Sequence, residues 1–160
     1  MKSPVLRNFL AAVLGYVVMF PVAFVLFSLM WMALGADGSF DLGVWDVSIA
    51  WLGGSTVLGL IVAMSGGFVC SKLGTADPAH GSDRPRRPQQ SVMILCFLVA
   101  AVGVWTALNG APPATSRPDD ISMFDAMTSA RLPTWLLWLN PVFGVIGVLL
   151  GAKLAARKSA

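Results

Sequence analysis

The sequence predicts an all-α membrane protein that crosses the bilayer four times. Hydrophobic residues make up 56% of its 160 residues and charged residues only 12%, about half the charged share of an ordinary soluble protein. The apolar residues gather in four runs, each long enough to cross a bilayer. None of these runs has a charged side chain in its interior, where one would cost roughly 3 kcal/mol on insertion.

The four runs define one transmembrane domain that covers residues 1–160. The predicted spans are about 9–34, 47–70, 91–108 and 134–154. The first is longer than a bilayer requires, and Pro21 near its middle offers a position for a bend. Because the apolar core of a cleaved signal peptide is shorter, this run is interpreted as a retained helix. The Pro- and Arg-rich segment 72–90 is predicted to be a flexible loop.

Basic residues are distributed unequally over the loops, and this predicts the orientation. With four spans, both chain ends and the loop 72–90 lie on one side, which carries nine of the eleven Lys and Arg residues. The other side carries only Arg117 and Arg131. Since the side richer in Lys and Arg faces the cytoplasm, we expect both ends to be cytoplasmic and the segments 35–46 and 109–133 to lie outside.

All six tryptophans are predicted to lie near the outer ends of the spans. Indole rings prefer the headgroup region, where the ring is buried and its N–H meets a polar partner. They are therefore interpreted as interfacial anchors, and an aromatic ligand site is the less favoured alternative. The six are Trp31, Trp45, Trp51, Trp105, Trp135 and Trp138.

The second span carries a row of small side chains at intervals of four residues, and the fourth span carries a shorter row. Residues with this spacing share one helix face, and small faces allow helices to pack closely in lipid. We expect the two helices to pack on each other, with an interface to a second copy as the alternative. The residues are Ser55, Gly59, Ala63, Gly67 and Ser71 in the second span and Gly144, Gly147 and Gly151 in the fourth.

The loop 109–133 contains a predicted amphipathic helix at about 119–131. Its two leading aspartates suit the positive N-terminal end of a helix, and apolar residues recur through the segment that follows. Phe124 and Met127 lie on its apolar face and form a candidate docking surface. Such a helix can lie in the headgroup plane, cover the bundle or bind a partner.

The usual signatures of enzymes and cofactor proteins are missing from the spans. Haem needs axial histidines, and proton-coupled transport generally uses an intramembrane carboxylate or histidine, whereas His80, the only histidine, falls in a predicted loop. Met123 and Met127 have thioethers that suit Cu(I), but methionine is also a common apolar filler. Cys70 and Cys96 are interpreted as free, inert thiols. We therefore expect no catalytic residue, metal or cofactor.

Asn140-Pro141 is the most notable polar pair within the spans. Pro141 frees a backbone carbonyl one turn earlier, and Asn140 can hydrogen-bond to a neighbouring helix. A kink with a local hydrogen bond is the preferred interpretation.

Two motifs carry a resemblance to other proteins. They are Gly66-Gly67-Phe68-Val69-Cys70-Ser71-Lys72-Leu73 at the end of the second span and Leu139-Asn140-Pro141-Val142-Phe143-Gly144 in the fourth. Both are similar to motifs of small bacterial inner-membrane proteins with four helices, a group with no established activity. The resemblance implies a multi-pass protein of the bacterial inner membrane, and it implies no site residue.

Packing signals without titratable groups favour a non-enzymatic membrane protein that acts through helix packing and protein contacts, as an accessory subunit or assembly factor. The alternative is a small transporter or channel for a small or lipophilic solute. The expected partners are the lipid bilayer and either another membrane protein or a second copy, and no nucleic acid. Substrate, partner identity and oligomeric state do not follow from the sequence.

Overall fold

The computed structural model of the protein describes residues 4–74, 90–110, 116–118 and 120–157. The helices in this part of the chain are α1 (Pro4–Ser39), α2 (Ile49–Leu73), α3 (Gln90–Asn109), α4 (Met123–Ser129) and α5 (Thr134–Arg157). Four of them, α1, α2, α3 and α5, are long and apolar enough to cross a membrane. The prediction of an all-helical chain with four candidate membrane spans is confirmed.

The first two long helices are separated by residues with clear local signals. The regular part of α1 ends at Gly35, which adopts a φ of 63°, a left-handed conformation that glycine adopts without steric cost. One further turn leads to Ser39. The start of α2 is capped by Ser48, whose hydroxyl accepts a hydrogen bond of 3.1 Å from the Trp51 backbone N–H, as expected for a serine N-cap.

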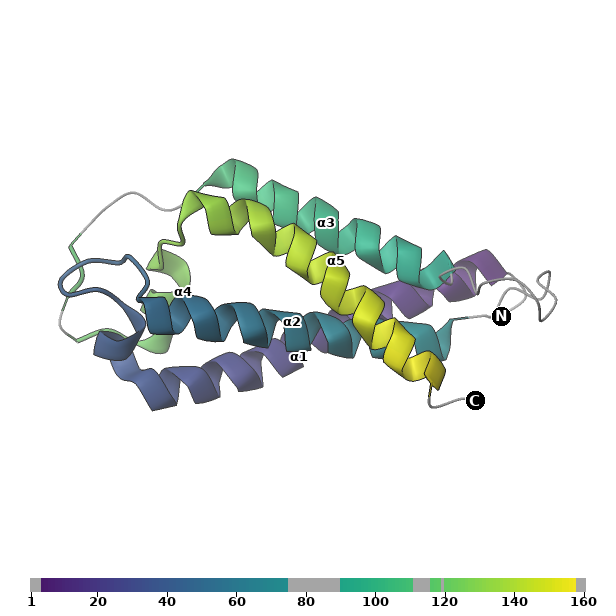
Figure 1. Cartoon of the computed structure of the whole chain (residues 1–160), viewed down its shortest axis with the longest axis horizontal. Coiled ribbons are helices and arrows are strands. Elements are labelled where there is room, and N and C mark those ends of the chain that lie inside the picture. The colour runs from purple at the N-terminus through teal and green to yellow at the C-terminus, as the bar shows by residue number, and fades with distance from the viewer. Residues whose placement is uncertain (1–3, 75–89, 111–115, 119, 158–160) are drawn as a thin grey trace.

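The long helices form two pairs, α1 with α2 and α3 with α5, which cross each other (Figure 1). Glycines allow close approach inside each pair. A Cβ at Gly15 would lie 2.8 Å from the Gly66 carbonyl oxygen in the first pair, and a Cβ at Gly103 would lie 2.8 Å from Pro141 in the second. The two pairs contact each other mainly through α2 and α5.

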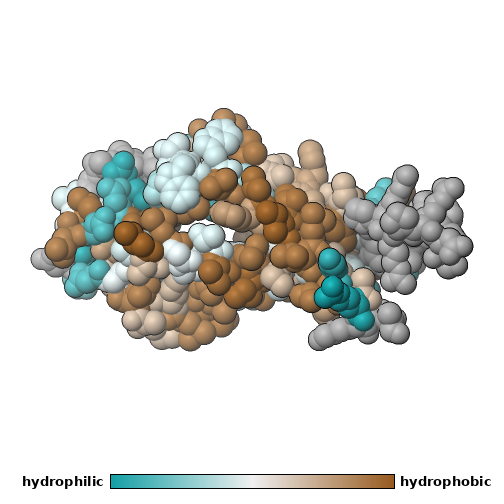
Figure 2. Space-filling view, in the orientation of Figure 1, coloured by the Kyte–Doolittle hydropathy of each residue, from teal (hydrophilic) through white to brown (hydrophobic). Residues whose placement is uncertain are grey.

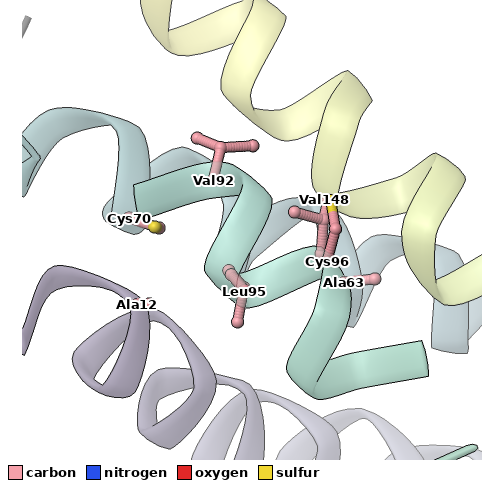
Figure 3. Packing of buried hydrophobic residues seen from close by; sticks show 7 residues of the cluster. All are labelled: Ala12, Ala63, Cys70, Val92, Leu95, Cys96 and Val148. Atoms are coloured by element: carbon pink, nitrogen blue, oxygen red, sulfur yellow. The ribbon is translucent and has the colours of Figure 1, made fainter. Parts of the chain in front are cut away.

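The buried core lies toward the end of the molecule where α1 begins and α5 ends, which we call the terminal end (Figure 1). Its side chains come from all four long helices and are mostly small (Figure 3), which suits helices that associate by close packing. They are Ala12, Ala63, Cys70, Val92, Leu95, Cys96 and Val148. Hydrophobic residues also cover much of the visible surface between the two ends (Figure 2).

At the opposite end, the cap end, two loops fold together into a cap formed by residues 40–48, 116–118 and 120–133. The first loop is a hairpin closed by an antiparallel bridge between Phe40 and Val47. The second loop binds this hairpin, because Arg117 and Arg131 donate their backbone N–H groups to hairpin carbonyls at 3.0 and 2.9 Å. The cap has its own apolar core, formed by Phe40, Trp45, Val47 and Ala126.

The helix in the second loop is shorter than predicted and begins later. It starts at Met123 rather than at the aspartates near position 119, because Ser122 and Asp125 form a capping box. The Asp125 N–H donates to the Ser122 hydroxyl at 3.2 Å, and the Ser122 N–H donates to the Asp125 carboxylate at 3.0 Å. Two backbone donors are satisfied in this way, an advantage over a start at Asp120. Asp119 lies outside the described residues.

Candidate functional site

Helix α4 presents two large apolar side chains to the surroundings. Phe124 is 71% exposed and Met127 is 63% exposed, whereas Ala126 is buried in the cap core. On the α1 side of the helix, the Met123 sulfur accepts a hydrogen bond of 3.6 Å from the Ser28 hydroxyl. The two predicted docking residues therefore form an exposed apolar edge on a helix that is fastened to α1.

The level of α4 along the bundle follows from the same hydrogen bond. Ser28 lies about two turns of α1 before Gly35, which is about 10 Å of helix rise. Helix α4 therefore lies beside the last turns of α1 and not beyond its end. A partner that reaches Phe124 and Met127 approaches from the side of the bundle.

Two ion pairs hold the second loop of the cap, one to the last turn of α1 and one to the hairpin. Arg117 Nη2 lies 3.0 Å from a carboxylate oxygen of Asp37, and Arg131 Nη1 lies 3.2 Å from one of Asp46. The Arg117 side chain is only 4% exposed, and its guanidinium lies over the Phe40 ring, 5.9 Å from the centroid. Its Nε and Nη1 have no hydrogen-bond acceptor among the described residues. Sequence reasoning treated Arg117 only as a loop charge, whereas the structure buries it in the cap.

Ser122 keeps the Asp125 carboxylate charged. The Ser122 hydroxyl donates to this carboxylate at 2.7 Å and its backbone N–H at 3.0 Å. These hydrogen bonds, the hydroxyl's first, hold the pKa of Asp125 below its ordinary value, because they favour the charged form. The hydrogen bonds at the start of α4 therefore favour an ionised carboxylate.

The six tryptophans separate into two groups. Trp31, Trp45 and Trp51 belong to the cap or pack against it, with the Trp31 and Trp51 rings 6.3 Å apart and edge to face. Trp45 is only 6% exposed, and its ring lies 5.5 Å from that of Phe40. Trp45 is thus part of the cap core, and the role of the six tryptophans as interfacial anchors stays a prediction. The second group is exposed and consists of Trp105, Trp135 and Trp138.

The predicted rows of small residues meet toward the terminal end. A Cβ at Gly67 would overlap the backbone of Val148, and a Cβ at Gly151 would overlap that of Met64. Gly147 also faces α2, where a Cβ would lie 2.9 Å from the Leu60 carbonyl oxygen and closer still to the Ala63 side chain. The backbones of α2 and α5 therefore touch here, and these contacts act as the crossing point of the two helix pairs.

The other residues of the rows lie elsewhere. A Cβ at Gly144 would meet Val99 of α3 rather than α2. The Ser55 hydroxyl donates to a carbonyl of its own helix, and Ser71 is half-buried. No atom among the described residues lies within 4 Å of a Cβ built at Gly59. The packing of α2 on α5 within this chain therefore does not extend to Gly59, and the alternative of an interface to a second copy stays a prediction.

Toward the cap end, α2 and α5 diverge and leave an opening, which we call the seam. The two helix pairs separate there in Figure 1, and the surface is hollowed between them in Figure 2. Gly59 lies on the α2 side of the seam, one turn from Ala63, which contacts α5. The seam thus begins where the close contacts of the crossing point end.

Helical spacing from Gly147, which faces α2, places Asn140 on the side of α5 that borders the seam. Asn140 continues the row of Gly144, Gly147 and Gly151 at helical spacing, and yet it is exposed. Gly147 contacts Ala63 of α2. Asn140 lies seven residues before Gly147, and Thr56 lies seven residues before Ala63. The two residues are therefore level with each other, on opposite sides of the seam.

A separate shallow groove of about 440 Å³ lies on the surface of α3. Its lining residues are Phe97, Ala100, Ala101, Val104, Trp105 and Leu108. All of them belong to one helix and all are apolar, as expected for a face in contact with lipid. We assign no site to this groove.

Groups with metal-binding or nucleophilic chemistry do not converge in the part of the chain that the structure describes. No three His, Cys, Asp or Glu side chains gather there as a metal site. Cys70 and Cys96 are free thiols buried among the helices. His80 lies outside the described residues.

The chain matches no protein-family model, no curated protein and no solved structure. The resemblance to small bacterial inner-membrane proteins stays a prediction from the sequence.

Proposed function

We propose that this protein is a non-enzymatic, multi-pass protein of the bacterial inner membrane that acts as an accessory subunit or assembly factor. The exposed apolar edge of α4, formed by Phe124 and Met127, carries the proposal. Two large apolar side chains held side by side on a fastened helix form a surface suited to another helix. Because α4 lies beside the last turns of α1, the partner is another membrane protein.

The construction of the cap supports a binding role. The capping box of Ser122 and Asp125, the hydrogen bond from Ser28 and the buried Arg117 all hold the second loop in one position. A surface that is ordered before binding loses less conformational entropy when a partner docks. The conformational entropy of this loop is already lost when the chain folds, so it does not weaken the complex.

The distribution of charge supports an orientation with the terminal end in the cytoplasm. Nine of the eleven Lys and Arg residues belong to the chain ends and the segment 72–90. The two remaining arginines, Arg117 and Arg131, are both engaged in ion pairs of the cap. The exposed edge of α4 then faces the non-cytoplasmic side of the membrane.

A photoreactive amino acid at position 124 tests the proposal in living cells. We expect irradiation to give one protein adduct of defined mass. The same residue at position 97 is the matched control, because Phe97 is as exposed as Phe124 but lies in the α3 groove. Adducts of equal yield and mass from both positions would mean that the edge of α4 only contacts the general membrane environment.

The second measurement uses the double variant Phe124→Asp, Met127→Asp. Because position 124 is then occupied by aspartate, the photoreactive residue is placed at the neighbouring position 128. We expect the adduct to disappear while membrane insertion and the unfolding temperature stay unchanged, since both replaced side chains are exposed. A variant that loses stability but keeps the adduct would identify α4 as an interfacial anchor instead.

A further inference from the structure

The seam is a built feature of the two helix pairs. Gly67 and Gly151 bring the backbones of α2 and α5 into contact at the crossing point. Each pair is closely packed in its own right, at Gly15 in one and at Gly103 in the other. Helices joined in this way and inclined to each other separate on both sides of the crossing point, so the space beside Gly59 follows from the packing.

Hydrocarbon is the medium available to fill this space. The helices that bound the seam are long and apolar enough to cross a membrane, and apolar residues lie along part of its mouth in Figure 2, beside residues of intermediate hydropathy. A buried water needs two to four polar partners, and the Thr56 hydroxyl already donates to the Leu52 carbonyl at 2.8 Å. A lipid acyl chain therefore fits the α2 side of the seam better than water does.

Asn140 provides a polar side chain at a defined position along α5. Asn140 follows the exposed Trp138 by two residues, which is about 3 Å of helix rise. Tryptophan marks the boundary between hydrocarbon and headgroups, which is where the ester carbonyls of a glycerolipid lie. The Asn140 amide can donate a hydrogen bond to such a carbonyl, and a donor without an acceptor is costly in this environment.

We propose that the seam binds one glycerolipid of the surrounding leaflet, with an acyl chain against Gly59 and an ester carbonyl that accepts a hydrogen bond from Asn140. The Asn140 amide would donate at the level of the ester carbonyls, and the seam beside Gly59 would hold the acyl chain. This site is separate from the edge of α4, so it goes beyond the proposed protein contacts and can fail independently of them.

Photolabelling of the full chain tests the proposal. The protein is reconstituted in phosphatidylcholine vesicles that contain a small share of phosphatidylcholine with a diazirine in one acyl chain. After irradiation, labelled peptides are measured by mass spectrometry. We expect residues 56–60 of α2 and 139–143 of α5 to carry more label than the α3 groove, which reports ordinary contact with the bilayer. Equal labelling of the seam and the α3 groove would overturn the proposal.

Two leucine variants in the same helix identify the site. Gly59→Leu fills the seam, and we expect its labelling to fall to the level of the α3 groove. Gly53→Leu is the matched control. A Cβ at Gly53 also has no atom of the described residues within 4 Å, but Gly53 is exposed whereas Gly59 is half-buried. The labelling of Gly53→Leu should equal that of the wild type. Unchanged labelling in Gly59→Leu would contradict the proposal.

Asn140→Leu is a further variant that does not depend on how Gly59→Leu folds. We expect an ester-linked probe to label the wild-type seam more than an ether-linked probe of the same length, because only the ester has the carbonyl acceptor. This preference should vanish in Asn140→Leu. Equal labelling by both probes in the wild type would remove the assigned role of Asn140 and with it the proposal.

The proposed lipid site would also be ruled out if the seam were closed or if a second copy of the chain occupied the seam. With Cys70 and Cys96 replaced by alanine, the double variant Thr56→Cys, Asn140→Cys reports the distance across the seam, because a disulfide requires Cα atoms closer than about 7 Å. We expect little cross-linking in lipid vesicles. A rapid and complete disulfide within one chain would show a closed seam, and one between chains would show a dimer.

Discussion

Arg117 shows how a single residue joins the two loops of the cap. Its guanidinium is buried between Asp37 and the Phe40 ring, and Asp37 itself is exposed. Burying an incompletely paired charge is costly. In return, Arg117 holds the second loop at two places, through its side chain to Asp37 in the last turn of α1 and through its backbone N–H to the Gly43 carbonyl of the hairpin.

We expect Arg117→Ala to loosen the cap more than Arg131→Ala. The Arg117 side chain is almost fully buried, so its removal leaves a cavity beside Phe40 and should cost about 1–3 kcal/mol. The Arg131 ion pair is partly exposed, and such pairs contribute about 0–1 kcal/mol. Thermal unfolding in detergent, followed by the fluorescence of the cap tryptophans, measures both. An equal loss of stability in the two variants would mean that the burial of Arg117 does not contribute to the stability of the cap.

At the scale of the element, glycine has different roles along the same helix. Gly67 is required by the contact between the backbones of α2 and α5, whereas Gly53 faces open space. Gly59 belongs to the same row as Gly67, but it borders the seam. Spacing alone therefore groups residues that the packing of the helices separates.

We expect Gly67→Leu to destabilise the bundle and Gly53→Leu to leave it unchanged. A leucine at position 67 would have to push α5 away from α2, and overpacking typically costs about 1–3 kcal/mol or more. The unfolding temperature in detergent measures the effect, with Gly53→Leu as the control for added bulk. A similar unfolding temperature for the two variants would show that the close contact of α2 with α5 is not needed for stability.

Helix α4 is predicted to respond to pH through its capping box. The pKa of Asp125 is lower in the folded chain than in the unfolded chain because Ser122 donates to the carboxylate. The stabilisation is therefore complete above the ordinary pKa of an aspartate and is lost as the pH falls through the lowered pKa. A spin label at position 127 should become more mobile over this acidic window.

The control for this prediction is Asp125→Asn. An amide cannot be protonated in this range, so the mobility of the spin label should no longer change with pH. A wild-type label that stays immobile at acidic pH would show that the cap contacts of Ile121 and Ala130, and not the capping box, hold α4 in place.

For the whole molecule, the charge distribution predicts both ends and the segment 72–90 on the cytoplasmic side. Reporter fusions after Ser82 and at the C-terminus should report the cytoplasm. A reporter inserted at the exposed Leu42 of the cap hairpin, or at Ala114, should report the opposite side. A non-cytoplasmic signal from the Ser82 fusion would contradict the orientation and the number of spans together.

The sequence by itself determined the four candidate spans and the small residues at the crossing point. Apolar runs without charges have few alternatives to membrane helices, because an unpaired backbone is not tolerated in hydrocarbon. The exact helix ends at Ser48 and Ser122 depended on hydrogen bonds of single hydroxyls. They follow local rules, and a serine cap could have been recognised at Ser122 from the aspartate three residues later.

Only the tertiary structure decided how the segments meet. The burial of Arg117 and Trp45 arises from contacts between two loops that are far apart in the chain. The seam arises because two closely packed pairs cross at Gly67 and Gly151, and the angle between them is set by the packing of all four helices. Periodicity within one helix contains no information on that angle, so the same spacing places Gly67 in a contact and Gly59 beside an opening.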